Sequence, residues 1–358
     1  IGERDREILD IFTNVYGMDE KKALSLTDPR ELVMEFSREI ELGMREMGFS
    51  IDWRRKFYTF DPEFSSFIKW QFHKLSEAGL ITKGKHPVPF CTRCGNAVGG
   101  HDTKGDVDPE MGEFTALKFR FLDGFMPAAT LRPETIYGAT NMWVNPEADY
   151  VKAAVDGEIF YVSKEAAGKL AMQDHKVEIL SNMKGRELEG KECAAPLTGK
   201  KVPVMCSKFV DPSNATGVVM SVPSHAPYDY VALREALGDR ADKMLIGIIS
   251  AKEWGAHPAK EIVEKMGIAG IDDPRLEDAT KEIYRDELHH GRMSVPGLEE
   301  RGVEEARESV KSMLIEKGDA VIVHEIINGP VKCRCGGDVS VKVLDDQWFI
   351  NYGLSLIH

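Results

Sequence analysis

Four cysteines stand in two close pairs that are separated by 238 residues. Cys91 and Cys94 form the first pair, Cys333 and Cys335 form the second, and a glycine follows each pair. Thiolates bind structural zinc, and four of them complete a tetrahedral site with no position left for water. The pairs therefore predict a structural zinc ribbon; a ribbon that folds without metal is the open alternative.

A second group of residues with chemical potential is the stretch 130–135, Thr-Leu-Arg-Pro-Glu-Thr. It offers hydroxyls, backbone amides and the Arg132 cation in a loop that Pro133 makes stiff. Such a loop is suited to binding a phosphate, a ribose edge or an ester carbonyl. Considered alone, the stretch is explained equally well by a solvent-exposed turn.

A third group lies in residues 215–230, where the apolar run 218–222 precedes a proline-rich turn and the start of a helix. Asp229 falls in the first turn of that helix, where the helix dipole favours a carboxylate. It is either a stabiliser of the helix start or a fixed anion that binds a substrate ammonium. His225 is interpreted first as a packed histidine of the turn and second as a catalytic base.

Composition limits the class of protein. The 358 residues can form two or three domains, and 42% hydrophobic with 29% charged residues is ordinary for globular protein. A net charge of −13 argues against a broadly basic surface for nucleic acid. No apolar run approaches the roughly 18 residues of a membrane helix, and paired cysteines suit a reduced, cytoplasmic protein. Because the sequence lacks an initiator methionine, we expect a piece of a longer protein.

Residues 1–85 are predicted to be helical. Asp28 and Asp61, each followed by proline, predict two helix starts, and Gly48 and Gly79 predict the ends. Both helices carry apolar residues at helical spacing, and the aromatic stripe of the second helix is predicted to be buried. The apolar residues are Leu32, Val33, Phe36, Ile40, Met44 and Met47 in the first helix, and Phe64, Phe67, Ile68, Phe72 and Leu75 in the second.

Residues 113–322 mix the two kinds of secondary structure. The predicted strands include 116–121, 159–162, 218–222, 244–249 and 321–323, and the predicted helices include 228–237 and 303–316. Interleaved strands and helices predict a compact α/β or barrel-like domain between the cysteine pairs.

Together these features resemble the editing insertion of class I aminoacyl-tRNA synthetases, most closely that of leucyl enzymes of the archaeal and eukaryotic type. The resemblance rests on 130–135, on 216–229 (Thr-Gly-Val-Val-Met-Ser-Val-Pro-Ser-His-Ala-Pro-Tyr-Asp) and on 50–55. The Thr-Pro-Trp-Thr element of isoleucyl enzymes is absent, and the insertion interrupts the ribbon as in the archaeal type. Two positions depart from the pattern: Ala215 replaces a glycine, and Leu131 stands where a second threonine is common.

The resemblance implies a fold and a domain organisation. Residues 113–322 are expected to form a mixed α/β, barrel-like editing domain that is inserted in a zinc ribbon of residues 86–112 and 323–350. Residues 1–85 are expected to be a helical segment of the catalytic and connective region. The His-x-Gly-His and Lys-Met-Ser-Lys-Ser elements that hold ATP are absent, so ATP and Mg²⁺ are expected only in the full-length enzyme.

The resemblance also implies a reaction, the hydrolysis of the ester in mischarged tRNA(Leu). Its partners would be the tRNA 3′ end and a noncognate amino acid such as norvaline or isoleucine, and no membrane; a monomer is expected. The implied catalytic residues are Asp229 for the α-ammonium, with Thr130 and Arg132 for the ribose and carbonyl. The implied substrate-binding residues are Leu131, Thr135, Met220, Val222 and His225.

Two other classes of function stay open. The chain could be a tRNA-docking or interaction module whose editing site is inactive, for which the departures at Leu131 and Ala215 are the support. It could also be a metal-dependent hydrolase that uses His101, Asp102 and the cysteines, although no further histidine set accompanies them.

Overall fold

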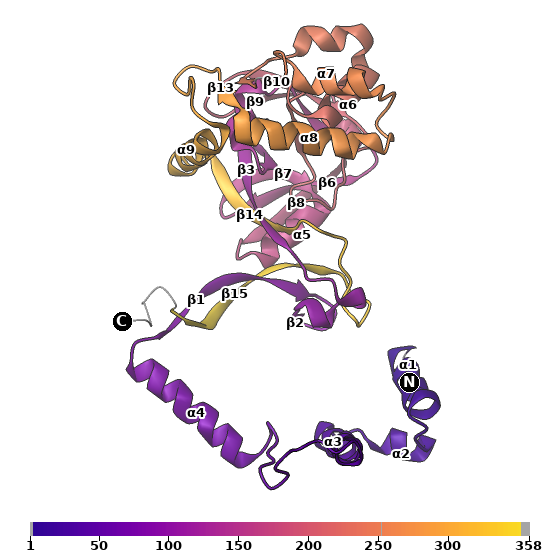
Figure 1. Ribbon diagram of the computed structural model, residues 1–358. Helices are drawn as coiled ribbons and strands as arrows, with labels where there is room; N and C mark the ends of the chain where they lie inside the picture. The colour runs from indigo at the N-terminus through magenta and orange to yellow at the C-terminus, as the bar shows by residue number, and fades with distance from the viewer. Residues whose placement is uncertain (1–2, 252, 352–358) are drawn as a thin grey trace. The chain divides into compact units, whose positions relative to one another are not determined.

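The computed structural model describes residues 3–251 and 253–351, which divide into two compact units (Figure 1). The smaller unit holds the described residues up to 85 and from 345 onward, and the larger unit holds residues 86–344. Residues 1 and 2 of the predicted helical segment lie outside the described residues. No helix of the described part is long and apolar enough to cross a membrane.

The smaller unit is mainly helical. Its helices are α1 (Glu3–Asp10), the π-helical turn η1 (Ile11–Val15), α2 (Glu20–Ser25), α3 (Pro29–Glu46) and α4 (Pro62–Glu77). The two predicted helices are confirmed as α3 and α4, and the Asp28 side chain accepts the Arg30 N–H at 2.8 Å as a cap. The predicted burial of the aromatic stripe on α4 is wrong, because α4 has no buried residue, and α3 has none either. Periodicity identifies an apolar face, but it does not supply a partner for that face.

The larger unit contains most of the strands. They are β1 (Ile81–Cys91), β2 (Asn96–Ala97), β3 (Met111–Phe121), β4 (Gly124–Thr130), β5 (Asn141–Val144), β6 (Asp149–Val155), β7 (Glu158–Ser163), β8 (Val177–Lys184), β9 (Glu192–Ala194), β10 (Lys201–Cys206), β11 (Val219–Ser221), β12 (Ile249–Ser250), β13 (Arg292–Met293), β14 (Ala320–Ile326) and β15 (Val339–Ile350). β1 and β15 each have residues in both units.

The α-helices of the larger unit are α5 (Lys164–Met172), α6 (Pro227–Leu237), α7 (Pro258–Met266), α8 (Arg275–His290) and α9 (Val303–Glu316). Its short 3-10 segments are η2 (Gly100–Asp102), η3 (Lys104–Asp106), η4 (Pro133–Gly138), η5 (Gly185–Glu187) and η6 (Gly238–Met244). The helices predicted at 228–237 and 303–316 are confirmed as α6 and α9. The strand predicted at 244–249 is wrong, because η6 ends there and only Ile249 enters β12.

A ten-stranded mixed sheet organises the larger unit. Its order is β11-β5-β10-β9-β3-β4-β7-β6-β8, with β14 also paired to β3. The pairs β10–β5 and β4–β7 are parallel and the others are antiparallel. The mixed α/β class is therefore confirmed. The strand ladders form an open path among the described residues, so the predicted barrel-like shape is not a closed barrel.

Two hydrogen bonds of Thr216, which lies before the first strand of this order, β11, bring it close to β4 and β7 in the middle of the order. The Ser163 N–H donates to Thr216 O at 3.1 Å, and the Ala129 N–H donates to Thr216 Oγ1 at 3.3 Å. Thr216 lies before β11 and Ala129 is the next-to-last residue of β4, so the strands that lead to the two predicted site segments lie side by side.

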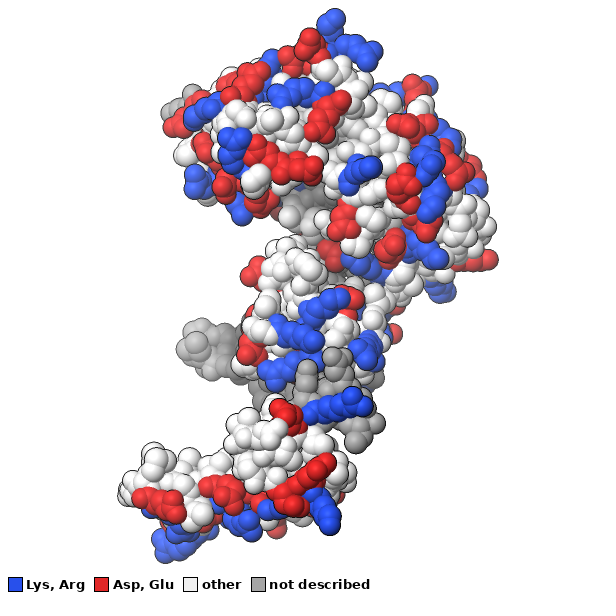
Figure 2. Space-filling model, turned by 90° about the vertical axis from the view of Figure 1, so that its right-hand side faces the viewer, with Lys and Arg blue, Asp and Glu red and all other residues white. Residues whose placement is uncertain are grey.

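The sheet has an apolar core on each face. Side chains of a strand alternate between faces, and in β3 Leu117, Phe119 and Phe121 join one core whereas Ala116 joins the other. α9 covers the first face through Val303, Ala306, Val310 and Leu314, and α5 covers the second through Ala166, Ala167 and Leu170. A third core unites α6, α7 and α8 (Figure 1). Acidic and basic side chains are interspersed over the upper part of Figure 2.

Candidate functional site

A cavity of about 220 Å³ gathers residues from β3, β4, η4, β11, α6 and α8 of the larger unit and from the loops between them. It holds the eight predicted residues of the substrate site together, and adds four that the sequence did not indicate. The predicted residues in its wall are Thr130, Leu131, Arg132, Thr135, Met220, Val222, His225 and Asp229. The added residues are Phe114, Ala129, Ala226 and Tyr284.

The loop 130–135 is folded by its own hydroxyls. Thr130 Oγ1 accepts the Arg132 N–H at 2.9 Å, and Thr135 Oγ1 donates to Arg132 O at 2.7 Å. Pro133 begins η4, where its fixed φ suits the first helical position. The Thr130 hydroxyl accepts within the loop, so its hydrogen is available to a ligand in the cavity.

The turn between β11 and α6 is closed by Asp229. Its Oδ2 accepts the Val222 N–H at 2.7 Å, which ties the first turn of α6 to the end of the strand. Pro227 occupies the first helical position, where no N–H is needed. Asp229 thus stabilises the helix start, as the simpler interpretation predicts, and it also faces the cavity.

No cation among the described residues balances the charge of Asp229. The residue is 5% exposed, and no lysine or arginine of the described part pairs with it. Burial raises the pKa of its carboxyl to about 7, and the Val222 N–H lowers it only in part. A cation that enters the cavity would restore the favourable charged state.

His225 has no ring nitrogen left for catalysis. Its Nε2 accepts the Ile248 N–H at 2.9 Å, which requires the neutral ring to carry its proton on Nδ1. Nδ1 in turn donates to Glu287 Oε1 at 2.5 Å. The ring is 1% exposed, so the interpretation as a packed histidine fits the structure better than that as a base.

Arg132 is held by two buried glutamates. Its Nε donates to Glu134 Oε1 at 3.1 Å and its Nη2 to Glu287 Oε2 at 2.7 Å, and its guanidinium lies 4.6 Å from the Tyr284 ring centroid. Burial disfavours the cation, but the Glu287 and Glu134 carboxylates outweigh it and raise the Arg132 pKa. Burial also acts on Glu287, yet the Arg132 charge and the His225 hydrogen bond lower its pKa.

These glutamates were missed by sequence reasoning. Glu134 lies inside the stretch 130–135 and could have been noticed as a carboxylate two residues after an arginine. Glu287 comes from the last turn of α8, and its only sequence signal is a charged residue at a buried helical position. Nothing local connects it to Arg132, which lies 155 residues earlier.

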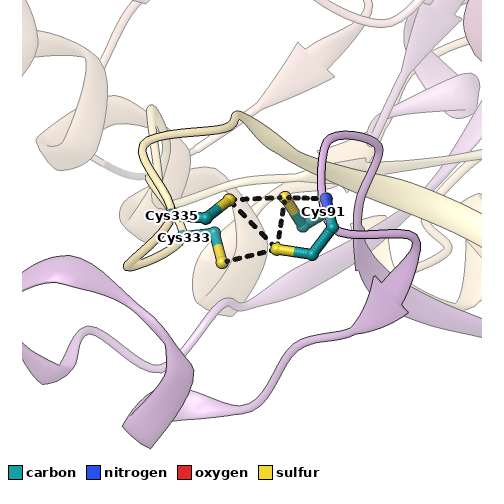
Figure 3. Close-up of side chains that lie close together, drawn as sticks. Cys91, Cys333 and Cys335 are labelled. Atoms are coloured by element: carbon teal, nitrogen blue, oxygen red, sulfur yellow. Dashed lines mark hydrogen bonds between the residues drawn. The ribbon is translucent and has the colours of Figure 1, made fainter. Parts of the chain in front are cut away.

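The four paired cysteines meet in the larger unit. Their Sγ atoms lie within 4.8 Å of one another. Figure 3 shows the labelled Cys91, Cys333 and Cys335 side chains close together. The Cys94 Sγ is 3.0 Å from Cys335 Sγ and 3.5 Å from Cys91 Sγ and Cys333 Sγ. A tetrahedral Zn²⁺ with bonds of about 2.3 Å separates sulfurs by about 3.8 Å. The set fits such an ion if the Cys94–Cys335 sulfur separation increases by about 0.8 Å and the two 3.5 Å separations by about 0.3 Å.

The surroundings of the cysteines also fit a metal. A Cβ on Gly337 would lie 2.8 Å from Cys91 Sγ, so only glycine leaves the sulfur its space. The Cys94 and Gly337 N–H groups donate to Cys91 Sγ and Cys335 Sγ at 3.5 and 3.4 Å. Asp102 instead accepts the Gly99 N–H, and in the described part only the cysteines form a candidate metal cluster. The other two cysteines lie outside this cluster; Cys193 is buried and Cys206 is half-buried.

A family comparison decides between the classes of protein. Residues 16–353 match the family model described as tRNA synthetases class I (I, L, M and V). The chain belongs to this family. The predicted resemblance is thereby confirmed on nearly the whole chain.

Within the class I tRNA synthetases, this chain is similar to archaeal leucine–tRNA ligases. It is 44% identical to that of Pyrobaculum arsenaticum over 99% of this chain. It is 46% identical to that of Methanocaldococcus jannaschii over 98% of this chain. The chain spans only 39% of the length of either relative.

Solved structures show the fold of this class I synthetase chain. The cytosolic leucyl-tRNA synthetase editing domain of P. knowlesi matches with a TM-score of 0.55 at 20% identity, over 61% of this chain and 98% of that one. The GlLeuRS-CP1 structure matches with a TM-score of 0.53 at 22% identity, over 59% of this chain and 99% of that one. The fold of leucyl-tRNA synthetase editing domains is therefore present.

The unbalanced charge of Asp229 should make the free energy of unfolding of the wild type depend on pH, and a substitution of Asp229 should remove this dependence. Because the pKa of about 7 in the folded state exceeds the ordinary 3.8, the folded state binds more protons between those values, and stability falls as pH rises from about 4 to about 7. Asp229→Asn keeps an acceptor for Val222 but cannot ionise. We expect it to match the wild type near pH 4 and to exceed it at pH 8 by at most about 4 kcal/mol.

Urea unfolding of both chains at pH 4, 6 and 8 measures this difference, since all other titrations are common to the two. An Asp229→Asn chain that is no more stable than the wild type at pH 8 contradicts the assignment of an unbalanced, buried carboxylate.

Proposed function

We propose that the 220 Å³ cavity hydrolyses the ester that joins a noncognate amino acid to the terminal adenosine of tRNA(Leu). The observation that carries the proposal is the buried Asp229 carboxylate. It faces the cavity, and no lysine or arginine among the described residues forms an ion pair with it. An α-ammonium is a cation that every aminoacyl ester carries. Leucine activation, with ATP and Mg²⁺, is proposed only for the full-length enzyme.

The residues of the cavity divide the recognition of such an ester. Asp229 binds the α-ammonium, and the Thr130 hydroxyl with the backbone at Arg132 holds the ester carbonyl and the ribose. A water oxygen attacks the carbonyl carbon, the bond to the ribose oxygen breaks, and that oxygen leaves as a hydroxyl with a proton from the water. The products are the free amino acid and tRNA. The water is oriented by these groups and a tRNA hydroxyl, and His225 only positions the turn.

The side-chain wall supplies the selectivity. Thr135, Met220 and Val222 line the cavity together with the apolar Leu131. An apolar pocket distinguishes one methylene by only about 1–3 kcal/mol, so a synthetic site that accepts leucine also accepts its near-isosteres. A second cavity that excludes leucine by size corrects those errors, and Thr135 is the residue that we assign to this exclusion.

A larger cavity of about 650 Å³ adjoins the first and shares Phe114 and Leu131 with it. It offers space for the tRNA end that does not fit beside the amino acid. The proposal therefore includes the 3′ end of tRNA(Leu) as partner, a monomeric protein in the cytoplasm, the editing domain at 113–322, and the ribbon at 86–112 and 323–350 with structural zinc.

The two departures from the family pattern are compatible with an active site. Ala215 has a φ of +46°, the region that glycine adopts most easily, and its N–H is held by Glu325 Oε2 at 2.9 Å. Leu131 is 47% exposed at the rim of both cavities. Neither change displaces Asp229 or Thr130, so the inactive docking module is the second candidate.

The zinc assignment predicts that metal content depends on the ribbon cysteines alone. The wild-type chain should contain about one zinc ion, Cys335→Ser should lose it, and Cys206→Ser should keep it, because four thiolates are needed for the closed site. Mass spectrometry of the metal content measures all three. Equal zinc in Cys335→Ser and the wild type would disprove the ligand set.

Loss of the ammonium site should abolish editing without unfolding the chain. We expect Asp229→Ala to lower kcat/KM for hydrolysis of norvalyl- or isoleucyl-tRNA(Leu) by about 100-fold, as for removal of one partner of a buried charge pair. The exposed Asp278→Ala on α8 is the matched control. Hydrolysis by Asp229→Ala at the wild-type rate contradicts the proposal, and absence of hydrolysis by the wild type favours the docking module.

The size of the residue at 135 should decide whether leucine is rejected. Thr135→Ala removes a methyl and a hydroxyl, and we expect it to hydrolyse leucyl-tRNA(Leu) at a rate that approaches that for norvalyl-tRNA. Thr135→Val keeps the branched volume and should still spare leucine. Both rates are measured by loss of the labelled ester, with the exposed Thr198→Ala as control. If Thr135→Ala spares leucyl-tRNA, the pocket assignment is wrong.

A further inference from the structure

A network of charged side chains lies beside the cavity, and all of them except the half-buried Arg307 are buried. Arg307 Nε lies 3.7 Å from Glu134 Oε2, Glu134 and Glu287 both bind Arg132, and Glu287 also accepts from His225. This network connects η4, the loop before η4, the turn after β11, α8 and α9. Two arginines and two glutamates balance one another, since the His225 ring is neutral.

Arg132 is the only lysine or arginine in the described wall of the cavity that also holds Asp229. A mobile guanidinium in that wall would be drawn to the unbalanced carboxylate, because opposite charges attract strongly where water is excluded. An Arg132–Asp229 ion pair would occupy the anion that the substrate ammonium needs. The structure shows no such pair; Arg132 bonds to Glu134 and Glu287.

Glu287 is placed to hold Arg132 in this position. Its side chain is 0% exposed, and its two oxygens accept hydrogen bonds from residues of two different loops. Oε2 accepts from Arg132 and Oε1 accepts from His225. His225 is four residues before Asp229, in the same turn. One carboxylate on α8 thus fixes both the cation and the turn that carries the Asp229 anion.

We propose that Glu287 is a positioning residue which, with Glu134, retains the Arg132 guanidinium and so keeps Asp229 free for the substrate ammonium. This inference rests on the proposed function, because it explains the availability of the ammonium site. It assigns to α8 a part in substrate recognition through Arg132 and His225, without contact to the substrate.

The test compares two ligands that differ only in the charge in question. The probes are an adenosine that carries norvaline in a non-hydrolysable 3′-amide, and the same compound without the α-amine. Binding of each to this chain is measured by calorimetry. The ratio of the two dissociation constants reports the ammonium site, whereas a general loosening of the fold weakens both ligands alike.

The wild-type chain should prefer the amine ligand by at least tenfold. Glu287→Gln, which keeps size but loses charge, should reduce that preference to less than threefold, and Glu287→Asp should restore it in part. Glu277→Gln, on the exposed side of the same helix, should retain the wild-type preference.

Each failure has its own meaning. A wild-type chain without amine preference overturns the proposed function. A wild-type preference that Glu287→Gln retains in full overturns the role of Glu287 alone. If Glu287→Gln does not fold, Glu134→Gln is measured in the same way, because Glu134 is the other carboxylate on Arg132. A full preference in Glu134→Gln then overturns the inference.

Discussion

Burial of a carboxylate is unfavourable because the charged form loses its water, and Asp229 is buried with one amide hydrogen bond in return. That single constraint organises the site. It requires Val222 and the start of α6 to hold the side chain in place, and it leaves the cavity with a strong preference for a cation. In the proposed reaction the α-ammonium of the substrate is that cation.

The neighbouring carboxylate of Glu287 shows the opposite solution. Glu287 is equally buried, yet Arg132 and His225 lower its pKa, so it stays charged without a ligand. The pKa of Asp229 is raised and that of Glu287 is lowered because Arg132, the cation in the described wall of the cavity, binds Glu287 and not Asp229. A site that binds a positive group needs both kinds of carboxylate: one that is compensated and holds the architecture, and one that is left for the ligand.

Local sequence signals predicted the secondary structure of the larger unit well where a segment is strongly apolar or capped. The apolar run 116–121 predicted most of β3, the stretch 303–316 predicted α9, and the cysteine pairs predicted the cluster of four thiols. The failures had physical causes. In residues 244–249 the apolar side chains fill cores: Ile246, Ile248 and Ile249 pack in the sheet core that α9 covers, and Leu245 packs in the α6–α8 core. Of this stretch only Ile249 pairs with another strand. The stripes of α3 and α4 mark apolar faces that the described residues do not bury.

The sequence by itself determined the residue types of the site: the threonines and arginine at 130–135, the carboxylate at 229 and the four thiols. It did so because each motif is local. Only the tertiary structure decided that Glu287, 155 residues from Arg132 along the chain, binds it, and that Ile248 fixes the tautomer of His225. These pairings depend on how α8 and the segment before β12 pack against two loops, and no short-range pattern encodes such distances. Charge balance in a cavity is a property of that packing.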